Sequence, residues 1–344
     1  MTKKLTLAYS QIAAFLKCRK AYEYHYIKRY DVVSANVPFL IGNCIHEGLH
    51  KIYAKDKDFI KSTLAYLEDY KQKLRESLSV SMQQEKEFIE FEQMIVGMLS
   101  SYAEKYKTII DKTEHIVNEH EEFVDISDNV QILLKIDNIL KRGDSSFVHE
   151  IKTTKYLTED YVNAIKDNMQ SSLYLHAFNS IKLKKEQLHG IIFDVIKKPS
   201  IRLKKNEAYE QYLNRLKKCY LADEMFYMEV IKYPLIKKEE MFETINEVAA
   251  DIFRCKDSGV WFKNFNACSK QHRCEFYMIC KHGENKLTMH NIKVRPTKEE
   301  REALAAQNEE KEQKEEAAKV HKKLIVSNTA TKKSVKSRTK KGEK

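Results

Sequence analysis

Three β-prone runs in close succession constrain the fold of this chain most strongly. The runs cover residues 116–126, 130–140 and 146–152, and a turn signal, Arg142-Gly143-Asp144, separates the last two. Long stretches with apolar residues at helical spacing flank them. The chain has only 8 glycines and 4 prolines in 344 residues, and such a composition favours helices. We therefore predict an α/β protein in which antiparallel strands are enclosed by helices.

The rest of the chain gives the order of the elements. Before the three runs we predict an amphipathic helix over residues 10–24 with Ser10 as its N-cap, then a helix around Ile45, Leu49 and Ile52. The remaining predicted elements are long helices within 57–110, a helix over 159–181, a strand over 189–196, a helix near 207–221, a strand or helix at 225–236 and an amphipathic helix over 238–255.

The third run contains the most informative residues. Phe147 and Ile151 share one strand face, which places Glu150 and Lys152 on the other. Pairing with the preceding run would bring Asp137 opposite Glu150. Two carboxylates and the Ile151 carbonyl suit Mg²⁺, and a lysine can orient the attacking water, so we predict a site of metal-dependent phosphodiester hydrolysis. The alternative is an ordinary strand, because Glu-x-Lys arises by chance in a chain with 32% charged residues.

Three further polar residues lie on predicted helices. His46 stands beside an apolar helix face, where a histidine is more often an interior residue than a metal ligand. Gln170 and Tyr174 are one helical turn apart. They are candidates for the active site because they follow the strand that carries Lys152, but a hydrogen-bonded pair inside the core is an equal alternative.

The chain has seven cysteines, and four of them suggest a metal site. Cys268, Cys274 and Cys280 are evenly spaced around an aromatic and apolar stretch, and Cys18 lies on the first predicted helix. Zinc usually uses closer Cys-x₂₋₄-Cys pairs, so the spacing favours iron and sulfur without deciding the choice. The other three, which we interpret as buried free thiols, are Cys44, Cys219 and Cys255.

Together these residues resemble the RecB-like iron–sulfur branch of the PD-(D/E)XK nuclease superfamily, close to phage exonucleases and CRISPR-adaptation nucleases. The resemblance runs from Ser10 to Cys280. It implies a restriction-endonuclease-like α-β-β-β-α-β core with a helical insertion and a C-terminal cysteine cluster. The roles it implies are metal ligation by His46, Asp137 and Glu150, catalysis assisted by Lys152, substrate contacts from Gln170 and Tyr174, and a 4Fe–4S cluster on Cys18, Cys268, Cys274 and Cys280. An additional acidic ligand is expected from the strand before Asp137, where Glu119, Glu121 and Glu122 compete.

The function that follows is a Mg²⁺- or Mn²⁺-dependent DNA exonuclease of recombination, repair or phage DNA processing, acting on DNA ends or single strands. A CRISPR-adaptation nuclease and a catalytically silent DNA-binding accessory protein remain the alternatives. The net charge of +11 and a pI near 9.0 fit a phosphate-rich partner. A recombination or repair protein is a possible further partner, and zinc is the alternative to the cluster.

The domain organisation and location are also predicted from the sequence. Residues 1–282 should form the nuclease domain, with a helical lobe at about 57–110. Residues 283–344 should form a charged, helix-prone segment and a disordered basic tail. No secretory signal or membrane-spanning apolar run is apparent, so we expect the cytoplasm of a bacterial or phage-infected cell.

Overall fold

The structure is a computed structural model that describes residues 4–32, 37–77, 82–182, 186–232, 236–268, 274–286, 292–297, 299–300 and 303. The chain divides into two compact units. The first combines Met1–Glu23 with Ser34–Tyr277, and the second combines Tyr24–Val33 with Met278–Lys344. Most of the predicted charged segment and the whole basic tail beyond residue 303 lie outside the described residues.

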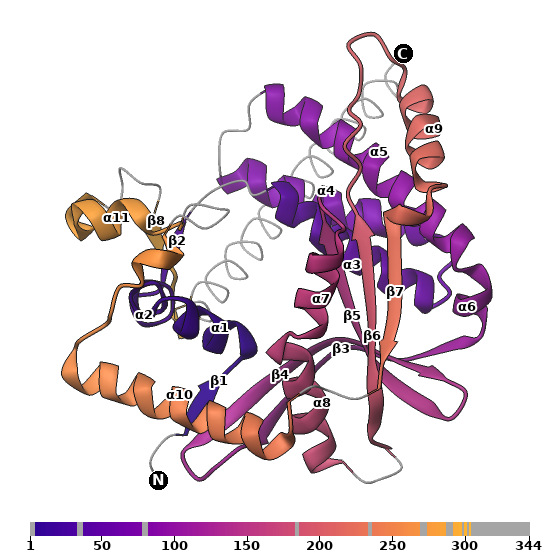
Figure 1. Cartoon of the computed structure of the whole chain (residues 1–344). Helices are drawn as coiled ribbons and strands as arrows, with labels where there is room; N and C mark the ends of the chain where they lie inside the picture. The colour runs from indigo at the N-terminus through magenta and orange to yellow at the C-terminus, as the bar shows by residue number, and fades with distance from the viewer. Residues whose placement is uncertain are drawn as a thin grey trace, which may run out of the picture. The chain divides into compact units, whose positions relative to one another are not determined.

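The elements alternate between helical and extended segments in an α/β pattern (Figure 1). The helices are α1 (Tyr9–Lys17), α2 (Arg19–Tyr22), α3 (Val37–Tyr53), α4 (Phe59–Ser77), α5 (Met82–Lys105), α6 (Lys107–Asp111), α7 (Glu159–Lys166), α8 (Met169–Ile181), α9 (Tyr209–Tyr220), α10 (Lys238–Ser258) and α11 (Tyr277–His282). The strands are β1 (Leu5–Leu7), β2 (Tyr30–Val32), β3 (Thr113–Asp125), β4 (Val130–Arg142), β5 (Ser145–Thr154), β6 (Leu188–Lys197), β7 (Phe226–Ile231) and β8 (Ile292–Val294).

The first unit is built on a mixed six-stranded sheet with the order β1-β4-β5-β6-β7, and β3 pairs with β4. The β3–β4, β4–β5 and β6–β7 pairs are antiparallel, whereas β1–β4 and β5–β6 are parallel. The β4–β5 hairpin turns at Gly143, whose φ of +60° suits glycine. Because β3 occupies one edge of β4, β1 and β5 share its other edge, β1 at residues 130–132 and β5 at residues 138–142.

Helices cover both faces of this sheet (Figure 1). On one face, Ile151, Ile192 and Ile196 join a core made with buried residues of α3, α5 and α9. The opposite face carries α8, which packs against β3, β4 and β6. Helices α3 and α5 approach closely at Gly48, where an added Cβ would lie 2.3 Å from Leu99 Cδ1. The sheet is therefore a rigid platform held from both sides.

The second unit contains the short antiparallel pair β2–β8. Glu284 fastens this unit by accepting hydrogen bonds from Lys28 Nζ at 2.5 Å and Tyr30 Oη at 2.8 Å. Cys280 lies on α11 in the same unit.

Across the described part of the chain, no helix is both long enough and apolar enough to cross a membrane.

The predicted α/β fold is confirmed, with three corrections to element boundaries. Ser10 is not the N-cap, because α1 begins at Tyr9 and Ala8 is the cap residue. The first predicted helix stops at Cys18, whose extended backbone (φ −164°, ψ 112°) separates α1 from α2. The helix predicted over 159–181 is two helices, because the Asn168 side chain accepts a hydrogen bond from Gln170 N and starts α8 anew. Residues 226–231 form a strand.

Candidate active site

The candidate site lies where two neighbouring strands part. The β4–β5 ladder ends at the pair Asn138↔His149. Continuing this register places Asp137 opposite Glu150, but from Glu150 onward β5 continues in its ladder with β6. Asp137 therefore stands on a part of the β4 edge that neither β1 nor β5 pairs with. Separating strands leave space for side chains from other elements to enter.

Alternation along β5 then sorts the side chains by face, as the sequence predicted. Ile151 is fully buried in the core that includes α3 and α5. Glu150 and Lys152 point to the other face. Asp137 lies beyond the last pair of the β4–β5 ladder, but its charge, like that of Glu150, acts on Lys152. Glu150 is only 4% exposed, whereas Asp137 is half-buried. An ordinary surface strand would not bury a glutamate to this degree without a charged partner.

Each of the two carboxylates has a positive or polar partner. Lys152 Nζ forms an ion pair with Glu150 Oε1. His46 Nδ1 on α3 lies 3.2 Å from Asp137 Oδ2. Burial by itself would raise the pKa of Asp137, but the hydrogen bond from His46 and the charge of Lys152 outweigh it and lower that pKa. For Lys152, burial opposes the charged form, yet Glu150 and Asp137 raise its pKa.

Gln170 and Tyr174 of α8 face the same charges. Burial, the charge of Glu150 and that of Asp137 together raise the pKa of Tyr174, against a hydrogen bond with Gln170. The two residues are thus hydrogen-bonded to each other and also lie beside the carboxylates. The hydrogen-bonded pair is therefore present, and a role of these residues in the active site stays a prediction.

Two tyrosines near Lys152, Tyr9 and Tyr161, were not predicted from the sequence. Tyr9 Oη donates a 2.7 Å hydrogen bond to Asn168 Oδ1, and burial raises the pKa of Tyr9 while Lys152 lowers it. Burial likewise raises the pKa of Tyr161, with Lys152 acting in the opposite direction. Neither tyrosine belongs to a motif with recognisable spacing. Their proximity to Lys152 follows from the packing of α1 and α7, so sequence pattern offered no signal.

A second histidine on α3 lies behind the site. His50 is one helical turn beyond His46 and 4% exposed. Among the described residues neither ring nitrogen has a hydrogen-bond partner, and Glu47 Oε2 is 3.8 Å from Nδ1. Burial lowers the pKa of His50 to about 4, although Asp137 acts in the opposite direction. His50 is therefore a neutral histidine in the core beside a charged site.

Of the acidic candidates on β3, two are neutralised by lysines. Glu121 pairs with Lys135, and Glu122 Oε2 lies 2.8 Å from Lys182 Nζ. Glu119 is in register with Asp137 and has a left-handed φ of 52°, with an exposed side chain.

Three of the four predicted cluster cysteines lie near one another in the first unit. Asn264 N donates to Cys18 Sγ at 3.5 Å, and Cys268 Sγ lies 3.6 Å from Asn264 O. Cys274 N donates to Cys268 O at 3.3 Å. Burial raises the pKa of Cys274, and the nearby Cys18 and Cys268 raise it further. None of these three cysteines is in a disulfide bond.

The remaining cysteines behave as small interior residues. Cys44 and Cys255 are buried, as predicted, and Cys219 is half-buried. Burial raises the pKa of all three thiols, which keeps them protonated and unreactive.

The donor chemistry of the carboxylate site fits a divalent cation. Within the described ranges no three His, Cys, Asp or Glu side chains are grouped as ligands of one ion. Glu150 is turned to Lys152, and Asp137 to His46. Both carboxylates are thus already compensated by positive or polar groups, and a cation would supply the same sign of charge. Two carboxylates and one imidazole are hard to intermediate donors of the kind that Mg²⁺ and Mn²⁺ accept.

Comparison with known proteins agrees with this geometry. A sequence profile of the PD-(D/E)XK nuclease superfamily matches residues 6–281. The chain belongs to the PD-(D/E)XK nuclease superfamily. The match contains every candidate residue described above, and the central mixed sheet with its helices is consistent with the restriction-endonuclease-like fold of that superfamily. PD-(D/E)XK nucleases hydrolyse phosphodiester bonds and usually depend on divalent metal ions.

Other comparisons add little to the superfamily assignment. One similar solved structure is described as the crystal structure of SSO0001, with 13% identity, a TM-score of 0.28 and coverage of 63% of this chain and 86% of that chain. Among curated proteins, none matches this chain.

Proposed function

We propose that this PD-(D/E)XK protein is a Mg²⁺- or Mn²⁺-dependent DNA exonuclease acting on DNA ends or single strands. The observation that carries the proposal is that Asp137, Glu150 and Lys152 lie close enough for both carboxylates to raise the pKa of Lys152, at the point where β4 and β5 separate. His46 adds an imidazole to the same group.

The residues would divide the chemistry as follows. His46, Asp137, Glu150 and the Ile151 carbonyl would hold the cation, which when bound polarises the phosphoryl oxygen and lowers the pKa of water. Lys152 has a raised pKa and is protonated at neutral pH. With its positive charge it would orient the attacking water and stabilise charge on the phosphoryl group.

Substrate contacts come from α8. Gln170 and Tyr174 lie beside the carboxylates, so their polar groups are within the region that a scissile phosphate must occupy. Tyr9 extends this polar wall through its bond to Asn168. These side chains carry no negative charge at neutral pH and so tolerate a polyanionic substrate.

The cysteines belong to a second part of the proposal, a structural 4Fe–4S cluster held by Cys18, Cys268, Cys274 and Cys280. The proximity of Cys18, Cys268 and Cys274 supports it, because Cys18 is far in sequence from the other two. A cluster there would tie the end of α1 to residues 268–280 and close a very long loop. Zinc is the rival metal, and iron analysis of protein purified without oxygen distinguishes the two.

The activity is tested on DNA labelled at the 5′ or 3′ end. We expect degradation with Mg²⁺ or Mn²⁺ and none in EDTA, with stepwise products from one end. Glu150→Gln should lower kcat by roughly 10²–10³-fold or more. Glu121→Gln is the matched control, because Glu121 pairs with Lys135 on the exposed part of β3. Metal-independent cleavage, or equal activity of both variants, would refute the proposed site.

The cellular role follows from the products. Exonuclease activity would suit recombination, repair or phage DNA processing, and a partner protein of those pathways would be expected. Short trimmed products that an integrase accepts would favour a role in CRISPR adaptation. DNA binding without cleavage in any metal would favour the accessory-protein alternative.

A further inference from the structure

A strongly basic loop follows β6 and leads into α9. Residues 197–205 contain five positive charges, and no acidic residue occurs before Glu207. Arg202, Lys204 and Lys205 are exposed. After Lys197, the last residue of β6, the segment carries no regular secondary structure except a turn at residues 205–206. A segment of this charge and composition would ordinarily be a mobile, solvated loop.

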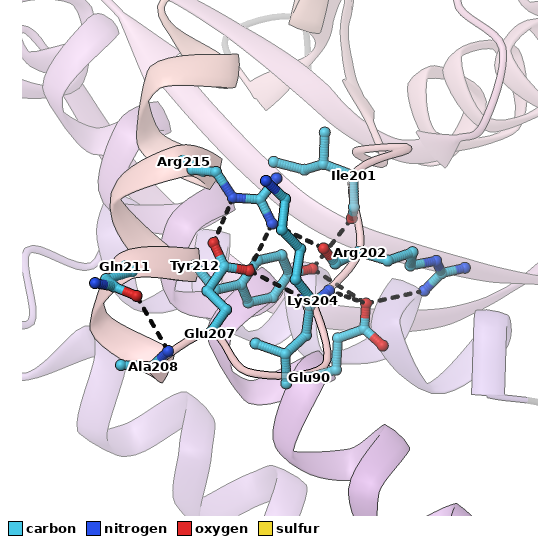
Figure 2. A network of polar contacts seen from close by, with 10 residues as sticks. Glu90, Ile201, Arg202, Lys204, Glu207, Ala208, Gln211, Tyr212 and Arg215 are labelled. Carbon is cyan, nitrogen blue, oxygen red and sulfur yellow. Dashed lines mark hydrogen bonds and ion pairs between the residues drawn. The ribbon is translucent and has the colours of Figure 1, made fainter.

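This loop is instead held in place by hydrogen bonds to side chains of α5 and α9 (Figure 2). Glu90 Oε1 of α5 accepts a 3.2 Å hydrogen bond from Leu203 N. The Tyr212 hydroxyl of α9 lies 3.3 Å from the same oxygen and 3.2 Å from Ile201 O. Tyr212 is fully buried, so it provides a rigid anchor for the backbone at residues 201 and 203.

A second set of bonds holds the far end of the loop. Arg215 on α9 forms a bidentate ion pair with Glu207, with Nε 2.5 Å from Oε1 and Nη2 2.7 Å from Oε2. Its Nη2 also donates to Arg202 O at 2.8 Å. Glu207 Oε2 in turn accepts a 3.1 Å bond from Lys204 N. Bidentate pairs of this kind are geometrically specific. Backbone groups at residues 201–204 are therefore held while the lysine side chains project outward.

The loop starts beside the candidate active site. In the β5–β6 ladder, Lys152 is opposite Val195 and Thr154 is opposite Lys197. Lys198 N donates a 2.6 Å hydrogen bond to Thr154 O. Two strand residues span about 7 Å, so the first basic residues lie roughly that far along the sheet from Lys152. The six residue-to-residue steps from Lys198 to Lys204 can extend at most about 20 Å further.

We propose that residues 197–205 form a preorganised arm that binds the DNA backbone phosphates leading away from the scissile bond, a proposal that rests on the function proposed above. At about 3.4 Å of rise per nucleotide, the arm reaches on the order of six nucleotides. Lys204 and Lys205 carry most of the binding charge, because Glu90 lies 3.6 Å from the Arg202 guanidinium and partly neutralises it. Because the backbone of the arm is already fixed, binding of DNA does not cost the conformational entropy of ordering a loop.

The test compares Lys204→Gln/Lys205→Gln with Lys57→Gln/Lys112→Gln, which removes the same charge from exposed lysines. Lys112 adjoins Thr113, which pairs with Arg142 at the opposite end of the sheet. Binding to a fluorescent 12-nucleotide single strand is measured by anisotropy in EDTA across a range of salt concentrations. We expect the arm variant to bind at least fivefold more weakly. The slope of log K against log salt should fall by roughly 1.4, or 0.7 per lysine, and the control should change far less.

A third variant distinguishes DNA binding by a fixed arm from non-specific electrostatic attraction. Glu207→Gln raises the net charge of the protein by one unit because it removes a carboxylate, but it also removes the anchor of Lys204 N and Arg215. A positioned arm predicts weaker binding, whereas general attraction predicts tighter binding. Equal losses of DNA affinity in the two lysine variants, or tighter DNA binding by Glu207→Gln, would refute the proposed arm. Because these measurements need no cleavage, an absence of metal-dependent degradation by the wild-type protein would refute the nuclease function separately.

Discussion

Acidification should destabilise this protein through His50, and replacing that residue by phenylalanine should remove the effect. His50 is buried on α3, and neither of its ring nitrogens is hydrogen-bonded among the described residues. Its pKa is lowered from 6.5 to about 4, chiefly by burial. The folded state therefore holds the neutral ring, whereas the unfolded chain takes up a proton near pH 6.5.

The sign and size of the effect follow from this difference. The stability that depends on neutral His50 is fully present above pH 6.5 and is lost as the pH falls towards 4, because only the unfolded chain binds the proton in that window. At about 1.4 kcal/mol per pH unit the full loss is roughly 3 kcal/mol. Between pH 7 and pH 5 the expected loss is about 2 kcal/mol.

Urea denaturation at pH 7 and pH 5 measures this loss. The single tryptophan, Trp261, stacks on Tyr22 at 5.9 Å between ring centroids and reports unfolding by fluorescence. EDTA keeps metal ions from biasing the charges of His46 and Asp137. The wild-type protein should lose about 2 kcal/mol more than His50→Phe on acidification. Equal losses in the two proteins would refute the claim that burial keeps His50 neutral.

Three other outcomes are expected. Gly48→Ala should cost about 1–3 kcal/mol in urea denaturation, because its Cβ would lie 2.3 Å from Leu99 Cδ1, and adding Leu99→Ala should recover part of that cost. Lys152→Met should lower kcat by roughly 10²-fold or more while Mn²⁺ affinity measured by calorimetry changes little; a matching loss of Mn²⁺ binding would contradict its role on the phosphoryl group. Protein purified anaerobically should absorb broadly at roughly 400 nm, and Cys274→Ser should abolish this absorbance whereas Cys255→Ser should not; colourless, iron-free wild-type protein would exclude the cluster.

Local pattern predicted those parts of the fold that local chemistry determines. The alternation of Phe147, Glu150, Ile151 and Lys152 predicted the faces of β5 correctly, because burial acts on every second residue. The turn at Gly143 predicted the hairpin for a similar reason. Strands of three residues, such as β1, have too few positions to show a period, so they were not predicted.

Other features depend on contacts between distant segments, which spacing does not encode. The break before α8 arises because the Asn168 side chain bonds Gln170 N, although the apolar spacing continues across it. Tyr9 and Tyr161 approach Lys152 only through tertiary packing. The separation of β4 from β5 at Asp137 likewise requires knowing which strands pair, and it decides where a site can open.

The hairpin register carries a consequence for how this site can evolve. Glu150 and Lys152 are on the sheet face of the candidate site, and Ile151 on the opposite face, only because the turn at Gly143 sets the register of β5 against β4. A single-residue insertion after Gly143 that shifted the whole strand would send both side chains into the apolar interior and expose Ile151. Length changes at this turn should therefore be tolerated in steps of two residues, so the number of residues in a surface turn determines which side chains reach the candidate site.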